Sequence, residues 1–404
     1  MPARLKRWPP PWLFLILMLP GGIYSGFIQT PLPYVLGKAG VPVDRIANIA
    51  SVIQVPTIFY FLWAPLVDMK LRRRNWMMLA SFASAVCLVV TMPLVGVSHL
   101  TAIAVLLFAG MAVNVLVSAA QGGLMVTSLS REGQAQASAW TQAGNLGGGA
   151  LGAGITMWFL AHLPLPVAGL ATAAMTAVPS LAALLISEKP PATSSNWIDH
   201  LGKIFKELLA VFHSRRTVWG LVLLASPVAS GAALNLLPAV AEQYGVGREG
   251  VMWVNGVAGG LVLASGSLLA ALVPGDWDRR LTYAAAGLLN GLASLTLLAG
   301  NHPMVYYVGT VLYLVTTGAG YARFIALVID ILGPGEHGTS TRYSLFLAAG
   351  NLPITYVLWM DGQGFRHFGT RGLFGVDALG NVLVFTLVAG IWLAHRKTAP
   401  VLPK

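Results

Sequence analysis

The sequence predicts an all-α polytopic membrane protein with twelve transmembrane helices, arranged as two pseudo-symmetric six-helix bundles. Three observations indicate this class. The 404 residues are 56 % hydrophobic and only 10 % charged, whereas soluble domains carry about 25 % charged residues. Apolar stretches long enough to cross a bilayer, about 20 residues each, recur almost from end to end. In addition, short sequences of the first half reappear in the second half.

Each apolar stretch is predicted to be a helix, because backbone groups inside a bilayer must be hydrogen-bonded within their own segment. No alternation of about ten residues indicates a barrel. The first stretch follows Arg4, Lys6 and Arg7 and lacks a small-residue cleavage site, so we interpret it as an uncleaved span. The predicted spans are 12–36, 46–68, 75–97, 100–128, 134–161, 165–187, 217–241, 248–274, 279–299, 304–332, 339–361 and 372–395.

Lysine and arginine are distributed unequally between alternate loops. The termini and the loops after the even-numbered spans hold 19 of them, and the loops after the odd-numbered spans hold 5. Cytoplasmic loops carry the excess of Lys and Arg. We therefore expect both termini in the cytoplasm and a multi-pass location in the inner (cytoplasmic) membrane of the cell.

The two halves share short sequences in the same order. SGFIQTPLPYVLGKAGV begins at Ser25 and SGAALNLLPAVAEQYGV at Ser230, and AGNL occurs at 143–146 and 349–352. This repetition predicts an N-terminal bundle over residues 1–187, a cytoplasmic linker loop over 188–216 and a C-terminal bundle over 217–404. Two such halves suit a transporter whose bundles move against each other around a central site.

An apolar run ends in a charged cluster after the second span, FLWAPLVDMKLRRRNW, residues 61–76. Arg72, Arg73 and Arg74 can hold this turn at the anionic inner leaflet. Asp68 can pair with an arginine, or cap a helix, in only one of two transport states, and such a contact shifts the equilibrium between them. We therefore predict a gating role for these four residues. A plain topology signal would explain the arginines but not an aspartate at the apolar boundary.

The same stretch, FLWAPLVD followed by RRRNW, resembles the second-span signature of AmpG-type muropeptide permeases and the related acetyl-coenzyme A transporters. These proteins form one branch of the major facilitator superfamily. The first span and LPYVLGKAGVPVDRIANIAS are also similar, so the resemblance covers about residues 12–80. It implies the major facilitator fold, alternating access and import of a solute. Siderophore permeases share the FLWAP pattern, so the motif does not identify the substrate.

The fourth span departs from the AmpG pattern. AmpG-like proteins usually carry AxQD there, with a second acidic residue four positions later. Residues 119–126 read AAQGGLMV, so Gln121 is kept while Gly122 and Val126 stand at the acidic positions. A role of those carboxylates in proton coupling or substrate contact is therefore missing or has moved.

Polar residues within the predicted spans indicate a hydrated pathway, because polar side chains in hydrocarbon usually face the bundle interior or a watery cavity. Asn114, Ser118 and Gln121 have the spacing of one helix face. For any single residue, hydrogen bonding between helices is the alternative. The predicted pathway residues are Tyr24, Gln29, Gln54, Asn114, Gln121, Asn145, Arg323 and Asn351.

The tenth predicted span carries two charges, Arg323 and Asp330, seven residues apart and so on one side of the helix. A charge at mid-bilayer costs roughly 2.5–3.5 kcal/mol, which makes the deeper Arg323 a candidate for holding a carboxylate or phosphate. Asp330 is the candidate for proton coupling. A structural ion pair with another span is the alternative for either residue.

Signals for other classes are weak. GGGALG, residues 147–152, matches a dinucleotide pattern that belongs between a strand and a helix. Inside an apolar helix these small residues predict close helix packing or a hinge. The histidines lack metal-ligand spacing and no nucleophile–base pair is evident, so we predict no enzyme activity, cofactor or metal. Membrane topology explains the net charge of +11 better than nucleic acid does.

The sequence therefore predicts a monomeric secondary transporter in the lipid bilayer for a medium-sized polar or anionic small molecule, and the resemblance to AmpG-type permeases implies import. Protons are the candidate coupling ion, and no ATP-binding motif indicates primary transport. Two alternatives stay open: an exporter or lipid-handling member of the same superfamily, and a membrane sensor or partner subunit that does not transport.

Overall fold

The computed structural model describes residues 9–63, 66–67, 71–188, 202, 206, 209, 214–274, 276–332 and 339–398. These residues are helical almost throughout and include no strand, which confirms the predicted all-α class. Seven helical segments in the described part are long and apolar enough to cross a membrane, and one of them, Leu345–Ala394, holds two helices. Four predicted spans are not among these seven segments: the second, fifth, seventh and ninth. They coincide with helical segments that are shorter or less apolar.

The chain folds into two compact units. Unit 1 comprises Met1–Val41, Val52–Phe205 and Arg248–Gly260, and unit 2 comprises Pro42–Ser51, Lys206–Gly247 and Leu261–Lys404. The helices α3 (Val43–Ile58) and α13 (Ala258–Ala271) each supply residues to both units. The division at residues 187 and 217 remains a prediction.

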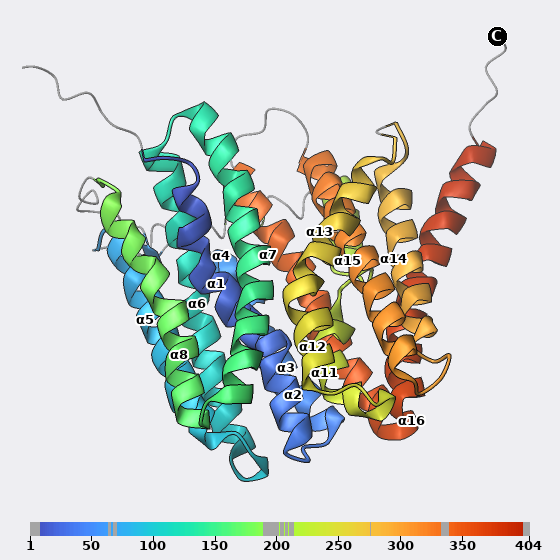
Figure 1. Cartoon of the computed structure of the whole chain (residues 1–404). Coiled ribbons are helices and arrows are strands. Elements are labelled where there is room, and N and C mark those ends of the chain that lie inside the picture. The colour runs from blue at the N-terminus through green and yellow to red at the C-terminus, as the bar shows by residue number, and fades with distance from the viewer. Residues whose placement is uncertain are drawn as a thin grey trace, which may run out of the picture. The chain divides into compact units, whose positions relative to one another are not determined.

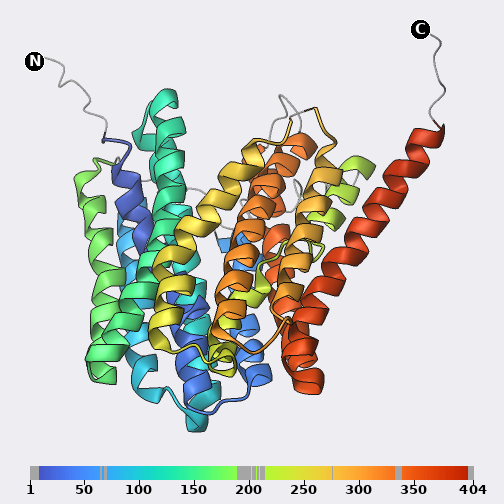
Figure 2. The ribbon, with the colours of Figure 1, turned by 45° about the vertical axis from the view of Figure 1, so that its right-hand side comes forward.

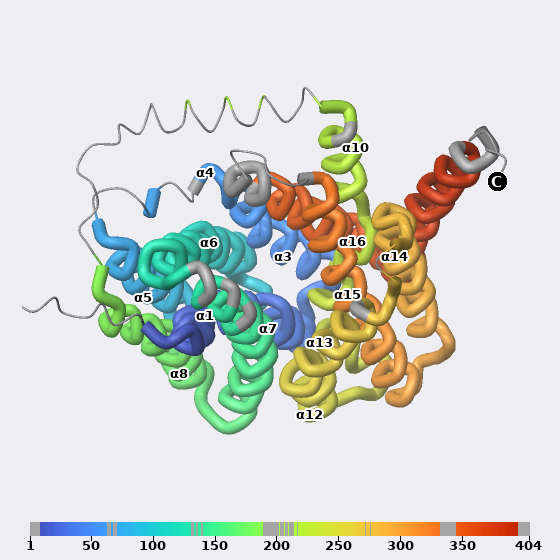
Figure 3. The backbone as a smooth tube through the Cα atoms, turned by 90° about the horizontal axis from the view of Figure 1, so that it is seen from above, coloured from blue at the N-terminus to red at the C-terminus, as the bar shows by residue number. Residues whose placement is uncertain are grey.

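Unit 1 is built around α1. This helix packs against α7 and also contacts α6 and α8, and the view in Figure 3 shows it among them. The helices of unit 1 are α1 (Leu13–Gln29), α2 (Pro31–Lys38), α4 (Tyr60–Trp63), α5 (Arg73–Thr91), α6 (Leu100–Ser128), α7 (Arg131–His162), α8 (Leu165–Ala177) and α12 (Arg248–Val251), with the 3-10 turns η2 (Met92–Leu94), η3 (Val97–His99) and η4 (Val178–Leu185) and the π-helical η7 (Met252–Val257).

Glycines allow α1 and α7 to approach closely. A Cβ atom added to Gly152 would lie 2.7 Å from Ile23 Cα, and one added to Gly148 would lie 3.3 Å from Leu19 Cα. The GGGALG stretch is therefore a helix-packing surface, as predicted, and lies within α7 rather than in a strand–helix turn. Backbones that approach this closely gain van der Waals contact, which drives helix association in lipid.

Unit 2 is centred on α14, which packs against both α15 and α16. In Figure 1 these three helices are labelled, and Figure 2 shows the C-terminal arm of α16 as the long red helix. Asp278 starts α14 by accepting hydrogen bonds from the Arg280 and Leu281 amides. The helices of unit 2 are α10 (Arg215–Leu224), η5 (Ala232–Asn235), α11 (Leu237–Val240), η6 (Ala241–Tyr244), α14 (Arg279–Thr296), α15 (Pro303–Leu332) and α16 (Thr339–Thr398).

The structure differs from the predicted eleventh and twelfth spans at their junction. The sequence predicted a loop over 362–371, but α16 is helical from Thr339 to Thr398 except at Gly369, where φ is 59°. Glycine tolerates this left-handed geometry, so the chain reverses in a single turn. Gly364 and Gly372 then pack backbone against backbone. The two arms form a helical hairpin without a polar loop.

Candidate functional site

The helix at the seventh predicted span is interrupted. The sequence predicted one span over 217–241, but α10 ends at Leu224 and the chain continues through turns to η5 and α11. Pro227 lies in the interruption, and both Ala229 (φ 46°) and Gly231 (φ 68°) take left-handed backbone geometry. Proline has no amide hydrogen to donate, and non-helical backbone at membrane depth is tolerated only where protein or a cavity satisfies it.

Four side chains of unit 2 satisfy the backbone groups that the interruption frees. Three are tyrosine hydroxyls that donate to carbonyl oxygens, and the fourth is an asparagine whose side-chain oxygen accepts from an amide. The bonds are Tyr283 to Val228 O (3.3 Å), Tyr321 to Ser230 O (3.5 Å), Tyr356 to Ala225 O (2.9 Å) and Ala229 N to Asn381 Oδ1 (2.8 Å). This buried polar frame was not predicted, although tyrosines within apolar spans are its visible signal.

The repeated sequences coincide with helix breaks. In unit 1, α1 ends at Gln29, Thr30 has non-helical φ and ψ of −125° and −61°, and α2 begins at Pro31. The residue equivalent to Thr30 is Asn235, at the end of η5. Interrupted segments at corresponding positions of two halves indicate the binding region of a transporter.

Arg323 lies nine residues before the end of α15 and is half-buried. Its Nε atom is buried, and the described part of the chain offers it no hydrogen-bond partner. The charge that acts on it there is another cation, Arg279 at the start of α14. An acidic partner, the alternative role for Arg323, is not found among the described residues around it. A cation with a buried, unsatisfied donor beside a second cation favours an anion.

Asp330 and Asn351 were predicted on the same grounds. Asp330 is half-buried near the C-terminal end of α15, and Asn351 is half-buried in α16. Two acidic residues that the sequence analysis did not select, Asp361 and Asp377, are fully buried in α16, with exposed fractions of 0 % and 1 %. Carboxylates inside apolar spans are functional candidates by default, so the signal for both was present in the sequence.

The buried pathway residues of unit 1 bond to neighbouring helices. Tyr24 donates to Leu107 O at 2.9 Å. Gln121 donates to Phe14 O at 2.6 Å and to Thr141 Oγ1 at 3.1 Å, while its Oε1 has no partner. Asn114 Oδ1 likewise has none. These bonds tie α6 to α1 and α7, and a role in a pathway stays a prediction.

The remaining predicted pathway residues are half-buried. Gln29 is the last residue of α1, Gln54 lies in α3, and Asn145 lies in α7, where its carbonyl oxygen would be 2.5 Å from a Cβ on Gly22. They are the predicted candidates most open to solvent in unit 1. Their contact with a solute also stays a prediction.

The arginine cluster tethers the start of α5. Glu188 accepts from the Arg73 and Arg74 amides, at 3.1 and 3.2 Å. The Arg73 guanidinium donates to Thr127 Oγ1 at 3.2 Å and that of Arg74 to Ile186 O at 3.2 Å. Arg72 is the half-buried residue before α5. Asp68 lies outside the described residues, so the predicted gating role is untested. Glu188 is an acidic partner of this cluster that the sequence analysis did not identify.

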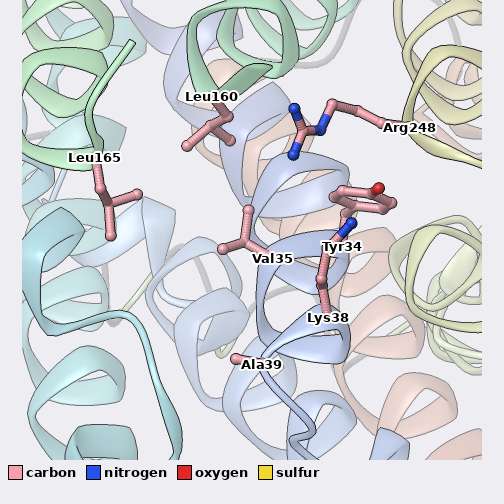
Figure 4. A pocket seen from close by; sticks show the side chains of 7 residues that line it. All are labelled: Tyr34, Val35, Lys38, Ala39, Leu160, Leu165 and Arg248. Carbon is pink, nitrogen blue, oxygen red and sulfur yellow. The ribbon is translucent and has the colours of Figure 1, made fainter. Parts of the chain in front are cut away.

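A pocket of about 260 Å³ opens in unit 1 between α2, the end of α7 and the starts of α8 and α12. Figure 4 shows Tyr34, the Lys38 amine and the Arg248 guanidinium at this pocket, with Leu160 and Leu165 across from them. The Arg248 Nε atom is buried, and no described residue hydrogen-bonds to it. The pocket therefore presents two cations beside an apolar wall, a combination suited to an anionic group carried on an apolar or ring-shaped molecule.

These features define a class: a polytopic helical membrane protein with an interrupted helix and buried charges, built on a transporter scaffold. The chain belongs to the Major Facilitator Superfamily, whose sequence model matches residues 13–355. No curated protein sequence matches it. In the described residues, no group of three His, Cys, Asp or Glu side chains could hold a metal ion.

Solved structures with the same fold are distant in sequence. The nucleoside transporter NupG is 12 % identical with a TM-score of 0.71, covering 94 % of this chain and 98 % of that one. A D-xylose-proton symporter is 12 % identical with a TM-score of 0.69, covering 94 % and 97 %. A bacterial homologue of the lysosomal transporter Spinster, solved inward-facing and occupied, is 13 % identical with a TM-score of 0.67, covering 95 % and 96 %.

Proposed function

We propose that this chain is a secondary transporter that imports a medium-sized anionic solute by alternating access, coupled to protons. Its branch of the superfamily is that of the AmpG-type permeases. Both termini lie in the cytoplasm and the protein works as a monomer in the inner membrane. The single observation that carries the proposal is Arg323, a cation in α15 beside a second cation and with an unpartnered Nε. Keeping such a charge in a span is costly, and an anionic solute would offset that cost.

Two further observations support the proposal. Lys38 follows the first predicted span and Arg248 begins the eighth, both at ends assigned to the outer side, so the cationic pocket of unit 1 would meet a solute arriving from outside. The interruption near Ala229 and Gly231 in unit 2 provides non-helical backbone that can rearrange. Among the proteins of the same fold, one is by name a proton symporter.

The test begins with a melting-temperature screen of purified protein over cell-wall fragments, siderophores and acyl-coenzyme A esters. Hits are then followed as uptake into vesicles of known orientation, with and without a pH gradient. Arg323→Ala should weaken binding of the anionic hit by roughly 10- to 100-fold, the effect of losing a charge-assisted hydrogen bond. Arg280→Ala, at an exposed position beside Arg279, is the matched control and should bind normally.

Three outcomes would overturn parts of the proposal. Accumulation only in inside-out vesicles would identify an exporter. Normal binding of the anionic hit by Arg323→Ala would remove this residue from the site. A protein that moves no member of the panel under any gradient, but co-purifies with a partner, would favour the sensor alternative.

A further inference from the structure

The two buried acids of α16 lie at matching positions in the helical hairpin. Asp361 precedes Gly369 by eight residues, and Asp377 follows it by eight. Because the arms pack closely at Gly364 and Gly372, the reversal brings the Asp377 carboxyl close enough for its charge to act on Asp361. Both side chains are sealed from solvent, at 0 % and 1 % exposed.

Three of the four carboxyl oxygens of this pair lack a donor among the described residues. Asp377 Oδ1 accepts from the Tyr313 hydroxyl at 3.0 Å, but its Oδ2 and both oxygens of Asp361 have no partner in the described part of the chain. Ser294 of α14 also lies beside Asp377, but its hydroxyl donates to Phe374 O at 3.2 Å. A buried carboxylate without a donor or a counter-charge is strongly disfavoured, so an isolated, doubly ionised pair is not a stable arrangement.

In the described part of the chain the cations of the packed elements point away from the buried pair, since Arg45 of α3 and Arg371 of α16 are exposed. The residues of η5, Ala232–Asn235, do not titrate. On α14, Tyr283 bonds to Val228, and its arginines lie at the helix start. On α3, Asp44 approaches Gly362 through its backbone. Arg366 and His367 are exposed near the hairpin turn. Asp377 is the charge that acts on Asp361 among the described groups.

We propose that Asp361 and Asp377 together hold one exchangeable proton inside the α16 hairpin and form the proton-coupling site of the transporter. Two carboxyl groups that share a buried site cannot both ionise, and one proton shared between them resolves the conflict. A divalent cation is a poorer occupant, because it takes about six or more oxygen ligands and no third acidic or histidine side chain joins the pair in the described residues.

The site connects directly to the interrupted helix. Asn381, one turn after Asp377, donates to Asp377 O at 2.9 Å and accepts from the amide of Ala229. Tyr313 also lies against the backbone of Ala233 while donating to Asp377. Loading or release of the proton therefore changes groups that bond to residues 229–233. Asp361 and Asp377 would then take over the role of the acidic residues that AmpG-like proteins carry in the fourth span and that are replaced here by Gly122 and Val126. This coupling role rests on the proposed transport function, whereas the presence of the proton does not.

The experiment is infrared spectroscopy of the full-length protein in lipid vesicles, titrated with pH and with sodium chloride, needing no substrate. Wild type should show the carbonyl band of a protonated, water-excluded carboxylic acid at neutral pH. Asp361→Asn should abolish it, because Asp377 then ionises with its Tyr313 donor and without a neighbouring carboxylate. Asp377→Asn leaves Asp361 buried without a donor, so the band should shift rather than disappear. Glu242→Gln, at an exposed position, should leave it unchanged. Tyr313→Phe keeps the ring but removes the donor that favours the ionised form, so the band should persist to a pH about one to two units higher.

The outcomes separate the two proposals. Absence of the band in wild type, or its unchanged survival in Asp361→Asn, would overturn the proton site whatever the protein transports. A band displaced by sodium at constant pH would overturn it in favour of a metal cation. If the band behaves as expected and a transported solute is known, Asp361→Asn should lose gradient-driven accumulation yet keep solute exchange. Loss of both would remove the pair from coupling.

Discussion

Asn381 is the residue whose removal best tests how the interrupted helix is held. It is fully buried, accepts the Ala229 amide at 2.8 Å and donates to Asp377 O at 2.9 Å. Asn381→Ala leaves the Ala229 amide unsatisfied in a site that excludes water. An unpaired buried donor costs about 1–3 kcal/mol, although hydrogen bonds between membrane helices average only about 0.6 kcal/mol. We expect a loss of about 1–3 kcal/mol, since here the partner stays buried.

The assay is thermal unfolding of the purified protein in one detergent, at one scan rate, with protein concentration fixed. A loss of that size should lower the midpoint by roughly 1–4 °C in a chain of 404 residues. Asn301→Ala, at an exposed position between α14 and α15, is the matched control and should change little. Hydrogen exchange of the segment around Ala229 should accelerate in Asn381→Ala alone. An unchanged midpoint together with unchanged exchange would show that Asn381 does not hold the interruption.

Three further expectations concern unit 1. Gly152→Val places a side chain against Ile23 Cα, 2.7 Å from the new Cβ. Overpacking should lower the free energy of unfolding by about 1–3 kcal/mol or more. The control Gly147→Ala, whose new Cβ meets open space, should keep the wild-type melting temperature. Glu188→Ala removes both side-chain acceptors at the start of α5 and should lower the stability of this helix end by about 1 kcal/mol. Hydrogen exchange at the Arg73 and Arg74 amides should then be faster. Glu188→Gln should give an intermediate exchange rate. Asp68→Asn should lower the maximal transport rate more than it weakens solute binding, and an effect confined to binding would argue against gating.

The fold was largely predictable because hydropathy and repetition are properties of the chain itself. Apolar stretches located most helices, and the repeated SG and LP pairs coincide with the breaks at Thr30 and Asn235. Hydropathy failed where a helix continues through polar residues. The predicted eleventh span ended at residue 361, which put Asp361 at the membrane–water interface. In the structure Asp361 is fully buried.

The site was only partly predictable, because the burial of a side chain and its hydrogen-bond partners depend on residues far away in the sequence. Arg323 was found from its depth alone, and the structure adds the neighbouring cation and the unpartnered Nε. The pairing of Asp361 with Asp377 depends on the reversal at Gly369. That reversal requires one residue with a positive φ, and the sequence offers several glycines nearby, among them Gly362, Gly364 and Gly372. Any of them could equally have indicated helix packing or a turn.

The two units differ in how their polar groups are arranged, and the difference bears on mechanism. In unit 1 the long helices α1 and α7 pack through glycine backbones, and the buried Gln121 amide of α6 bonds to both of them. Unit 2 carries the interrupted helix, the unpartnered carboxyl oxygens and Arg323. Bonds from tyrosine and asparagine side chains to an interrupted backbone can be exchanged one at a time, whereas a glycine-packed helix pair cannot shift without losing many contacts together. Local rearrangement during a transport cycle is therefore expected mainly in unit 2, with unit 1 moving as a more rigid body.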